Sequence, residues 1–593
     1  MRVRIAARRR SLSSGHGLAS KALALCSLYA VLACGSRSDL IFGGVAGTEV
    51  RDDAIGSVDG VGGAASAEAP PDNAPVGAGG STGLGSSGGQ SFGGGSGAGG
   101  SSVASAGMGG LVAAGGSTSE RPPQPAPPEV TQDPRFVGPD FRSGAEPTVD
   151  LGFPARCEGE PPSLDRTLEA LLAAVRAAPP DSRPFLRFVS VGHLTHGSCG
   201  SDSPPSGQLL VDMAREGVGE LLNYFSRSDQ VVLPRSLDVG QLLLQIDLRD
   251  YEWHGPVEVG GEGYADVWEM MVDYSRMATV FEGPVAFDLR SRTGTATPLL
   301  LSGDLAYAAY PNADLYYAAI ASPDTLEELR VRQGVQPAHD LSTGTWLAAG
   351  TSRSNVATSP RRVARYLEGG NAPPYWESAD FEVNSQVPGP FIAPLEDAAD
   401  GRVAIYALPN GLPAFFAADA AGQRRGVAEL LLDTFQNDFR ARAPVSCANC
   451  HFEGIIGVED EVRPVYLAAQ PGELEAIEEV LAVYPEQSEI DRAVREDQRY
   501  YAAARVRLGN RRPGAQGPEL ATVHDRDLDA EVMASELFVN VATLRQRLEV
   551  LPAEVAIVVL GGGTIQRRSF EAVYADALCA LNQGSENRPD GCR

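Results

Sequence analysis

The heptapeptide VSCANCH, Val445 to His451, brings two cysteines and a histidine within five residues. Three chemistries use a C-x-x-C pair: a redox disulfide, half of a zinc site, and covalent attachment of haem. The histidine directly after the second cysteine favours haem, because in C-x-x-C-H the two thiols bond to the haem vinyl groups and the imidazole binds the iron. The sequence therefore predicts one covalent haem c, attached at Cys447 and Cys450, with His451 as the proximal iron ligand.

The other two chemistries are weaker alternatives. Zinc needs two further ligands, and Cys579 and Cys592 do not form a second C-x2-C pair. A thioredoxin-type pair follows a strand in a βαβ unit and makes no use of a histidine such as His451.

The second axial ligand of the iron decides between electron transfer and ligand binding. Met533 is the one methionine after the motif, and its helical apolar position also suits core packing. His193 and His196, in GHLTHG, could ligate the iron if the upstream region covered the haem, whereas we expect His524 in an exposed loop. We therefore take Met533 and His193 as the candidate distal ligands, with an open or water-bound iron as the alternative.

The N-terminus predicts export. Six basic residues and no acidic one in the first 21 precede the apolar run Ala22 to Ala33, which is typical of a signal peptide covering residues 1–33. The run ends in VLAC, so we expect Cys34 to be acylated and to anchor the mature protein to a membrane, with plain secretion as the alternative. The localisation expected is periplasmic or outer-surface.

Residues 34–149 are rich in Gly, Ser and Pro and offer few apolar side chains for a core, so we expect a disordered tether. The chain has 49 Lys and Arg against 76 Asp and Glu, and without the six basic residues of the leader the net charge is about −33 (43 against 76). This balance argues against nucleic acid as a partner and is compatible with a basic redox partner protein.

In an oxidising compartment the remaining cysteines favour disulfides. Cys157 could pair with Cys199 at the start of the folded part, and Cys579 with Cys592 at the C-terminal tail.

The folded part is expected to contain two domains. Residues 150–420 predict an α+β domain, with a helix in SLDRTLEALLAAVRAA, strands in FLRFVSV and LLLQIDL, and a helix in ELLNYFSRS between the strands. A hairpin is expected at Asn410-Gly411. Residues 421–593 carry several helical periodicities and predict a mainly α, cytochrome c-like domain.

Two polar groups of the upstream region are weaker candidates for a site. Asp247, Arg249 and Asp250 either face the haem domain or pair locally at a strand end. The SRSN segment, Ser352 to Asn355, is either a site loop or an ordinary turn.

From about Leu164 to the C-terminus, the chain resembles a family of exported bacterial proteins with a cytochrome c domain and no assigned function. The similar segments include YALPNGLPAFFAADAAGQR, VSCANCHFEGIIGVEDEVRP and VLAVYPEQSEIDRAVREDQRYY, with RFVSVGHLTHGS and LLLQIDLRDYEWH upstream. The resemblance implies a single covalent haem at Cys447, Cys450 and His451, but no substrate.

The sequence thus predicts a monohaem c-type cytochrome that transfers electrons. The alternative is a haem enzyme or sensor that acts on peroxide or another small ligand at an open distal site. Dihaem peroxidases need two C-x-x-C-H motifs and this chain has one, which lowers the enzymatic alternative. A surface binding protein with a structural haem is the third possibility.

Overall fold

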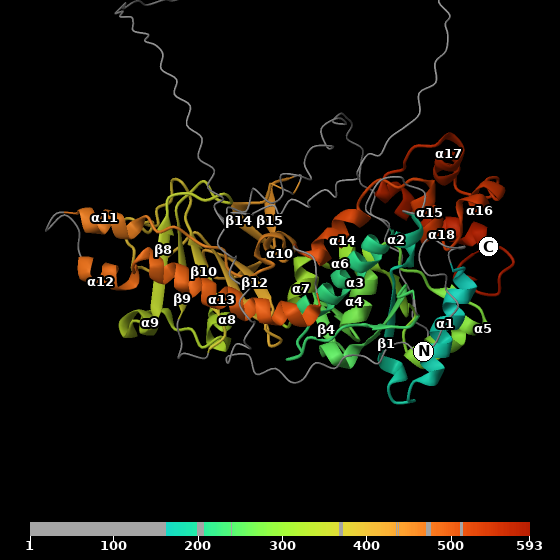
Figure 1. Cartoon of the computed structure of the whole chain (residues 1–593), viewed down its shortest axis with the longest axis horizontal. Helices are drawn as coiled ribbons and strands as arrows, with labels where there is room; N and C mark the ends of the chain where they lie inside the picture. Colours follow the sequence, from blue (N-terminus) through green and yellow to red (C-terminus); the bar gives the residue numbers. More distant parts are fainter. Residues whose placement is uncertain are drawn as a thin grey trace, which may run out of the picture. The chain divides into compact units, whose positions relative to one another are not determined.

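The computed structural model describes residues 162–197, 207–238, 240–366, 372–434, 436, 438–469, 476–509 and 514–592 (Figure 1). These residues belong to a single compact unit of the chain. They combine helices and strands, which confirms a mixed α+β fold. The predicted signal peptide, Cys34, the tether, Cys157 and Cys199 lie outside the described residues.

The first sheet has four strands in the order β2-β3-β1-β7. β1 (Leu186–Ser190) and β3 (Leu243–Asp247) are antiparallel and correspond to the two predicted strands, while β7 (Leu299–Leu301) pairs with β1 in parallel. All five residues of β1 are buried, which is why this strand reads as a short apolar run rather than an alternating one. The edge strand is β2 (Arg235–Ser236).

Both helices predicted near this sheet are present. α1 (Leu164–Ala177) begins after Ser163, whose hydroxyl accepts a hydrogen bond from the backbone N–H of Arg166 and so caps the helix. Its leucines at three- and four-residue spacing are buried. α3 (Gly207–Tyr224) covers the first half of the ELLNYFSRS segment and starts well before it.

The second sheet has six strands in the order β13-β12-β11-β10-β9-β8, and all neighbours are antiparallel. These strands are β8 (Trp346–Thr351), β9 (Arg361–Tyr366), β10 (Tyr375–Asp380), β11 (Gly401–Ala407), β12 (Pro413–Asp419) and β13 (Arg424–Arg425). The hairpin predicted at Asn410-Gly411 joins β11 to β12, and Gly411 has the positive φ of 86° that such a turn needs. The side-chain amide of Asn410 donates to the carbonyl of Asn223, which ties this hairpin to the end of α3.

The remaining elements are short connections and the C-terminal helices. The other strands are β4 (Val257–Val259), β5 (Glu262–Tyr264), β6 (Phe281–Glu282), β14 (Val427–Leu432), β15 (Arg440–Arg442) and β16 (Arg588–Pro589). The other helices up to residue 468 are η2 (Arg183–Phe185), α2 (Gly192–Gly197), η3 (Leu248–Tyr251), α4 (Val267–Tyr274), α5 (Pro284–Thr293), α6 (Ser302–Ala309), α7 (Ala313–Ala319), α8 (Leu326–Arg332), α9 (Pro337–Thr343), α10 (Val445–His451) and α11 (Val462–Ala468). The later ones are α12 (Ile477–Val483), α13 (Gln487–Leu508), α14 (Gln516–His524), α15 (Ala530–Glu536), α16 (Val541–Gln546), α17 (Ala553–Gly561) and α18 (Arg567–Leu581).

The predicted helical character of the chain after residue 476 is confirmed, and its packing crosses the expected domain boundary at residue 420. α14 packs against α3 and α6, α15 against α2, and α13 against β8. One continuous apolar core includes residues from α1 to α18. The C-terminal helices therefore bury their apolar faces against the upstream region as well as against one another.

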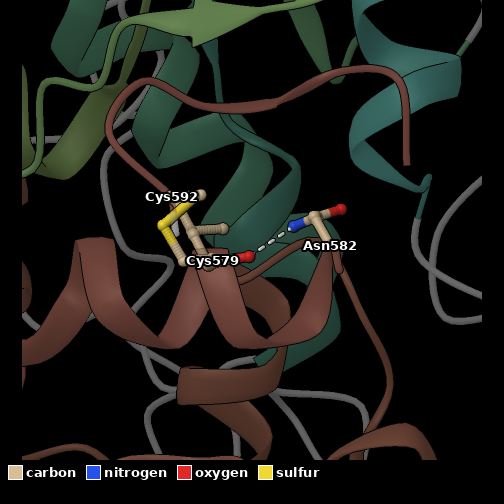
Figure 2. Close-up of a disulfide and its surroundings, with 4 residues drawn as sticks. Cys579, Asn582 and Cys592 are labelled. Atoms are coloured by element: carbon tan, nitrogen blue, oxygen red, sulfur yellow. Dashed lines mark hydrogen bonds between the residues drawn. A yellow bond between two sulfur atoms is a disulfide. The ribbon is translucent and has the colours of Figure 1, made fainter. Parts of the chain in front are cut away.

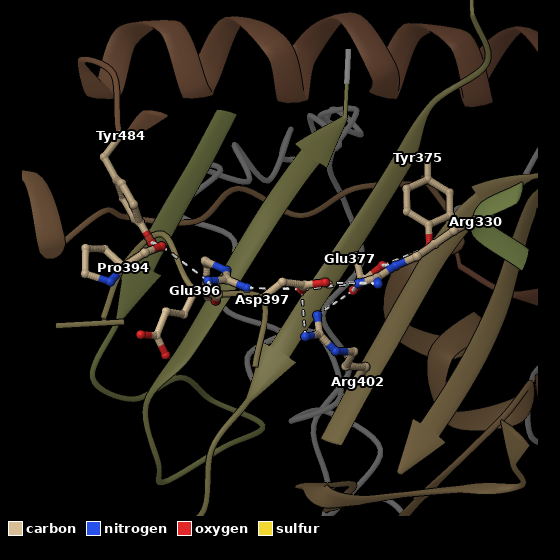
Figure 3. Close-up of polar contacts among 9 residues, drawn as sticks. Arg330, Tyr375, Glu377, Pro394, Glu396, Asp397, Arg402 and Tyr484 are labelled. Atoms are coloured by element: carbon tan, nitrogen blue, oxygen red, sulfur yellow. Dashed lines mark hydrogen bonds and ion pairs between the residues drawn. The ribbon is translucent and has the colours of Figure 1, made fainter. Parts of the chain in front are cut away.

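One face of the six-stranded sheet carries a buried ion network (Figure 3). The Glu377 carboxylate on β10 accepts two hydrogen bonds from Arg330 of α8, at 2.5 and 3.0 Å, and one from Arg402 of β11 at 2.6 Å. Both arginines also pair with Asp397, and the hydroxyl of Tyr375 donates to Glu377. The side chain of Glu377 is 1% exposed, so its charge depends on these partners.

The predicted disulfide of the C-terminal tail is present. Cys579 of α18 and Cys592 are bonded, with their Cα atoms 5.3 Å apart (Figure 2). β16, which lies between them in the chain, pairs with β6, so the tail is fixed covalently to α18 and by backbone hydrogen bonds to the upstream strand β6.

The ion network gives a stability prediction. We expect Glu377→Ala to lower the free energy of unfolding by about 3–5 kcal/mol, because two buried arginines lose a carboxylate. Glu429→Ala is the matched control, since Glu429 forms an exposed pair with Arg440 and should cost less than about 1 kcal/mol. Chemical denaturation monitored by circular dichroism measures both, and equal losses for the two variants would refute a structural role for the network.

Candidate haem-attachment site

The motif lies on one short helix, α10, as its spacing predicts. Cys447, Cys450 and His451 are separated by three and four residues, so their side chains project from the same side of the helix. The start of α10 is fixed by Ser446, whose hydroxyl accepts a hydrogen bond from the backbone N–H of Arg442 on β15. The β14–β15 hairpin therefore positions the helix that carries the motif.

All three motif residues line a cavity on the second sheet. The cavity has a volume of about 230 Å³, which is below the about 300–1000 Å³ typical of small-molecule pockets, and part of it is open to solvent. Most of its wall is apolar, and the apolar residues come from the sheet, the β8–β9 loop, the β14 strand and the loop after α10: Val356, Val363, Trp376, Val403, Ile405, Leu431, Leu432, Ile455, Ile456 and Val458. Such a wall suits a mainly apolar ligand.

The ring of His451 is oriented by a local hydrogen bond. Its Nδ1 lies 3.0 Å from the carbonyl oxygen of Gly454. A carbonyl can only accept, so Nδ1 carries the proton and Nε2 keeps its lone pair. Burial, and to a lesser extent the charge of Arg361, lowers the pKa of His451 to about 4, although the Gly454 bond opposes this. At neutral pH His451 is therefore an uncharged imidazole with Nε2 available to a metal.

The turn after α10 requires a glycine at position 454. Gly454 has a φ of 95°, and a Cβ there would lie 2.3 Å from the Tyr501 ring of α13. α13 also anchors the following segment, because Gln498 donates to the carbonyl of Ile455 and Gln487 to that of Val458. The carbonyl that orients His451 is thus fixed by the long helix α13.

The two cysteines differ. Cys447 has a free thiol, and burial raises its pKa to about 12, with a smaller contribution from Asp433, so the thiol stays protonated. Cys450 is disulfide-bonded, and its partner is not among the described residues. The two cysteines of the motif are therefore not bonded to each other, which excludes a C-x-x-C redox disulfide in this structure.

The structure does not bring the candidate distal ligands to this cavity. His193 on α2 lines a separate small cavity with Ser535 and Phe538, and Ser535 donates to the His193 carbonyl. Met533 on α15 is fully buried in the main core, as its apolar helical position predicts. Neither residue lines the cavity of His451.

His524 differs from the prediction of an exposed loop. It is the last residue of α14 and is 1% exposed. The cause is close packing of α6, because a Cβ at Gly303 would lie 2.7 Å from the His524 ring. His196 is on α2, and its side chain lies outside the described part.

The two weaker site candidates of the upstream region, the Asp247 group and the SRSN segment, lie in different surroundings. Asp247 and Arg249 form a local ion pair at 2.6 Å at the end of β3, which confirms local pairing. Ser354 and Asn355 of the SRSN segment line the cavity and so belong to the site.

Sequence reasoning missed the contribution of the sheet. Arg361, Trp376 and Ser378 line the cavity from β9 and β10, and the second of these strands ends at Asp380, well before the motif begins at Val445. The alternating pattern of RRVARY indicates a strand, but one strand cannot show which distant helix covers it.

No family model, no curated protein and no solved structure matches this chain. Within the described residues, no helix combines the length and apolar character needed to cross a bilayer. The same part of the chain has no cluster of three or more His, Cys, Asp or Glu side chains suited to a metal ion.

His193 gives a pH prediction. Burial lowers its pKa from 6.5 to about 4, with Glu536 opposing and His524 and Arg567 adding to the shift. Between pH 6.5 and 4 the unfolded chain binds more protons at this residue, so the free energy of unfolding falls by up to about 1.4 kcal/mol per pH unit as the pH decreases.

We expect His193→Leu to remove this part of the pH dependence while changing stability little at pH 7, because neither ring nitrogen has a protein partner among the described residues. His339→Leu, at an exposed site, is the control. Denaturation curves from pH 4 to 7 measure the slopes, and an unchanged slope in His193→Leu would contradict the assignment.

Proposed function

We propose that this protein is a monohaem c-type cytochrome, with one covalent haem c attached at Cys447 and Cys450 and ligated by His451. The supporting observation is that His451 has Nδ1 fixed by Gly454 and Nε2 available, beside both cysteines, at the wall of a mainly apolar cavity that is partly open to solvent. The chemistry of the other lining residues fits this group. The sheet provides an apolar wall of Val363, Val403 and Ile405, and Trp376 extends it.

The bound group would supply one-electron chemistry at iron. The chain contributes three things. The Gly454 carbonyl fixes the tautomer and direction of the His451 ring, and a hydrogen bond of this kind raises the basicity of the ligating nitrogen. The apolar wall would shield one side of the group from water. The sulfurs of Cys447 and Cys450 would act as covalent anchors when both are thiols.

Electron transfer is the activity we propose. The sequence-based expectations complete this proposal: export by the leader of residues 1–33, anchoring through an acylated Cys34, and a redox partner protein that complements the acidic surface. A mainly α, cytochrome c-like segment from residue 421 and membership of the exported cytochrome c family belong to the same proposal.

Ligand binding at the haem is the second candidate. Apart from His451, the described residues that line the cavity include no histidine and no methionine. An iron without a second strong protein ligand would be open to a small molecule, as a haem enzyme or sensor requires.

The first prediction concerns attachment. Protein made in a host with haem-c maturation should carry haem that remains bound after denaturation, and Cys447→Ala with Cys450→Ala should abolish it. Cys579→Ala with Cys592→Ala is the control and should keep the haem, because those cysteines form the tail disulfide. Haem staining of denaturing gels and absorption spectra provide the measurement. A wild-type protein without covalent haem would refute the proposal.

The second prediction concerns the open position. We expect the reduced haem to bind carbon monoxide rapidly, and Met533→Leu and His193→Leu to leave its spectrum unchanged, because neither side chain lines the cavity. Spectral titration measures binding. If the wild type excludes added ligands and either variant admits them, the replaced residue is the distal ligand and the electron-transfer candidate is strengthened.

A further inference from the structure

Arg361 is positioned by the register of the second sheet. On β9 it pairs with Asp380 of β10 and Thr351 of β8, and residues directly opposite each other share a face. That face also carries Val363 and Ser378, which line the cavity with Arg361. The guanidinium therefore lies on the cavity side of the sheet, opposite to the ion network of Glu377.

The Arg361 guanidinium contacts a carboxylate of the protein through one of its three nitrogens. Its Nε lies 3.0 Å from Oδ1 of Asp380, whose other oxygen accepts a hydrogen bond from the Ser378 hydroxyl at 2.9 Å. The contact is an ion pair without hydrogen-bond geometry, since Nε and Oδ1 both lack a hydrogen-bond partner. Asp380 therefore holds the Nε side of the guanidinium by charge, and within the described residues the two Nη groups make no hydrogen bond.

The surroundings favour an anion as the acceptor. Arg361 is the one arginine or lysine among the described residues that line the cavity, and its side chain is 13% exposed. The same lining contains two acidic residues, Asp433 and Glu377, and the Glu377 carboxylate is already paired with Arg330 and Arg402. A planar guanidinium fork at an apolar wall is well suited to a carboxylate, because charge-assisted pairs strengthen where water is excluded.

We propose that Arg361 is the anion-recognition group of this cavity and binds a carboxylate or small anion of the ligand that occupies it. This inference rests on the proposed function. The anion has two possible sources: the carboxylate side chains of haem itself, or an external anion that binds beside the haem.

The first arm uses full-length protein made without haem maturation, so it does not depend on covalent attachment. Iron-free protoporphyrin and its dimethyl ester, which lacks the two negative charges, are titrated while tryptophan fluorescence is recorded, with Trp376 lining the cavity. We expect Arg361→Gln to bind the free acid about tenfold or more weakly than the wild type and the ester equally well. Arg361→Lys should restore part of the loss.

Controls separate recognition from folding. Arg440→Gln removes a positive charge from β15, outside the cavity lining, and should bind like the wild type. Arg361→Gln with Asp380→Asn removes both charges of the buried pair, so this variant stays folded if Arg361→Gln alone does not, and it should show the same loss of free-acid binding.

The second arm uses haem-loaded protein and compares azide, an anion, with carbon monoxide, which is neutral. If Arg361→Gln lowers the affinity for azide but not for the free porphyrin, the anion that Arg361 binds is an external one. If it lowers the affinity for the free porphyrin, Arg361 binds the haem carboxylates. Equal affinities of wild type and variants in both arms would overturn the inference. If the wild type carries no haem, the proposed function fails, yet the first arm still decides the role of Arg361.

Discussion

The hydrogen bond between His451 Nδ1 and the carbonyl of Gly454 is the contact on which the site depends. It fixes the tautomer, so that Nε2 and not Nδ1 is the nitrogen with a free lone pair. The contact needs a turn with positive φ, and the Tyr501 ring leaves room for glycine alone at that position. α13 therefore determines the chemistry of a histidine on α10, although the two helices are separated in the chain by more than 30 residues.

The two faces of the second sheet have different surroundings: one face lines the cavity, and the other carries the buried ion network of Glu377. On β10, Trp376 and Ser378 point to the cavity side, while Tyr375 and Glu377 belong to the opposite face with the ion network. The network joins β10 and β11 to α8, and on the cavity side Asp497 of α13 accepts hydrogen bonds from Arg365 and Trp376. Charges buried on both sides thus fix the strands that form the cavity wall.

Several local features could be predicted from the sequence because their signals are local. The strands β1 and β3, the helix α1, the Asn410-Gly411 hairpin and the Cys579–Cys592 disulfide each depend on a short pattern. The spacing of the motif likewise predicted that Cys447, Cys450 and His451 share one side of a helix.

The cavity could not be predicted in the same way. Its wall combines β9, β10, β11, the β14 strand and the loop after α10, and only tertiary packing brings these together. The burial of His524 has the same origin, because it depends on the absence of a side chain at Gly303 in another helix. Polar residues such as Arg361 acquire a role only through the neighbours that the fold provides.

The position of His193 and Met533 bears on the choice between electron transfer and ligand binding. Both lie in the packing of α2 and α15, where Met533 fills the core and Ser535 holds the His193 backbone. Bringing either side chain to His451 would empty part of that core, and removing a large buried apolar side chain from its site costs about 2–5 kcal/mol. An iron–thioether bond would have to exceed that cost. If a haem is attached at Cys447 and Cys450 as proposed, the described lining would hold it through His451 without a methionine or a second histidine, and the carbon monoxide titration decides between the two candidates.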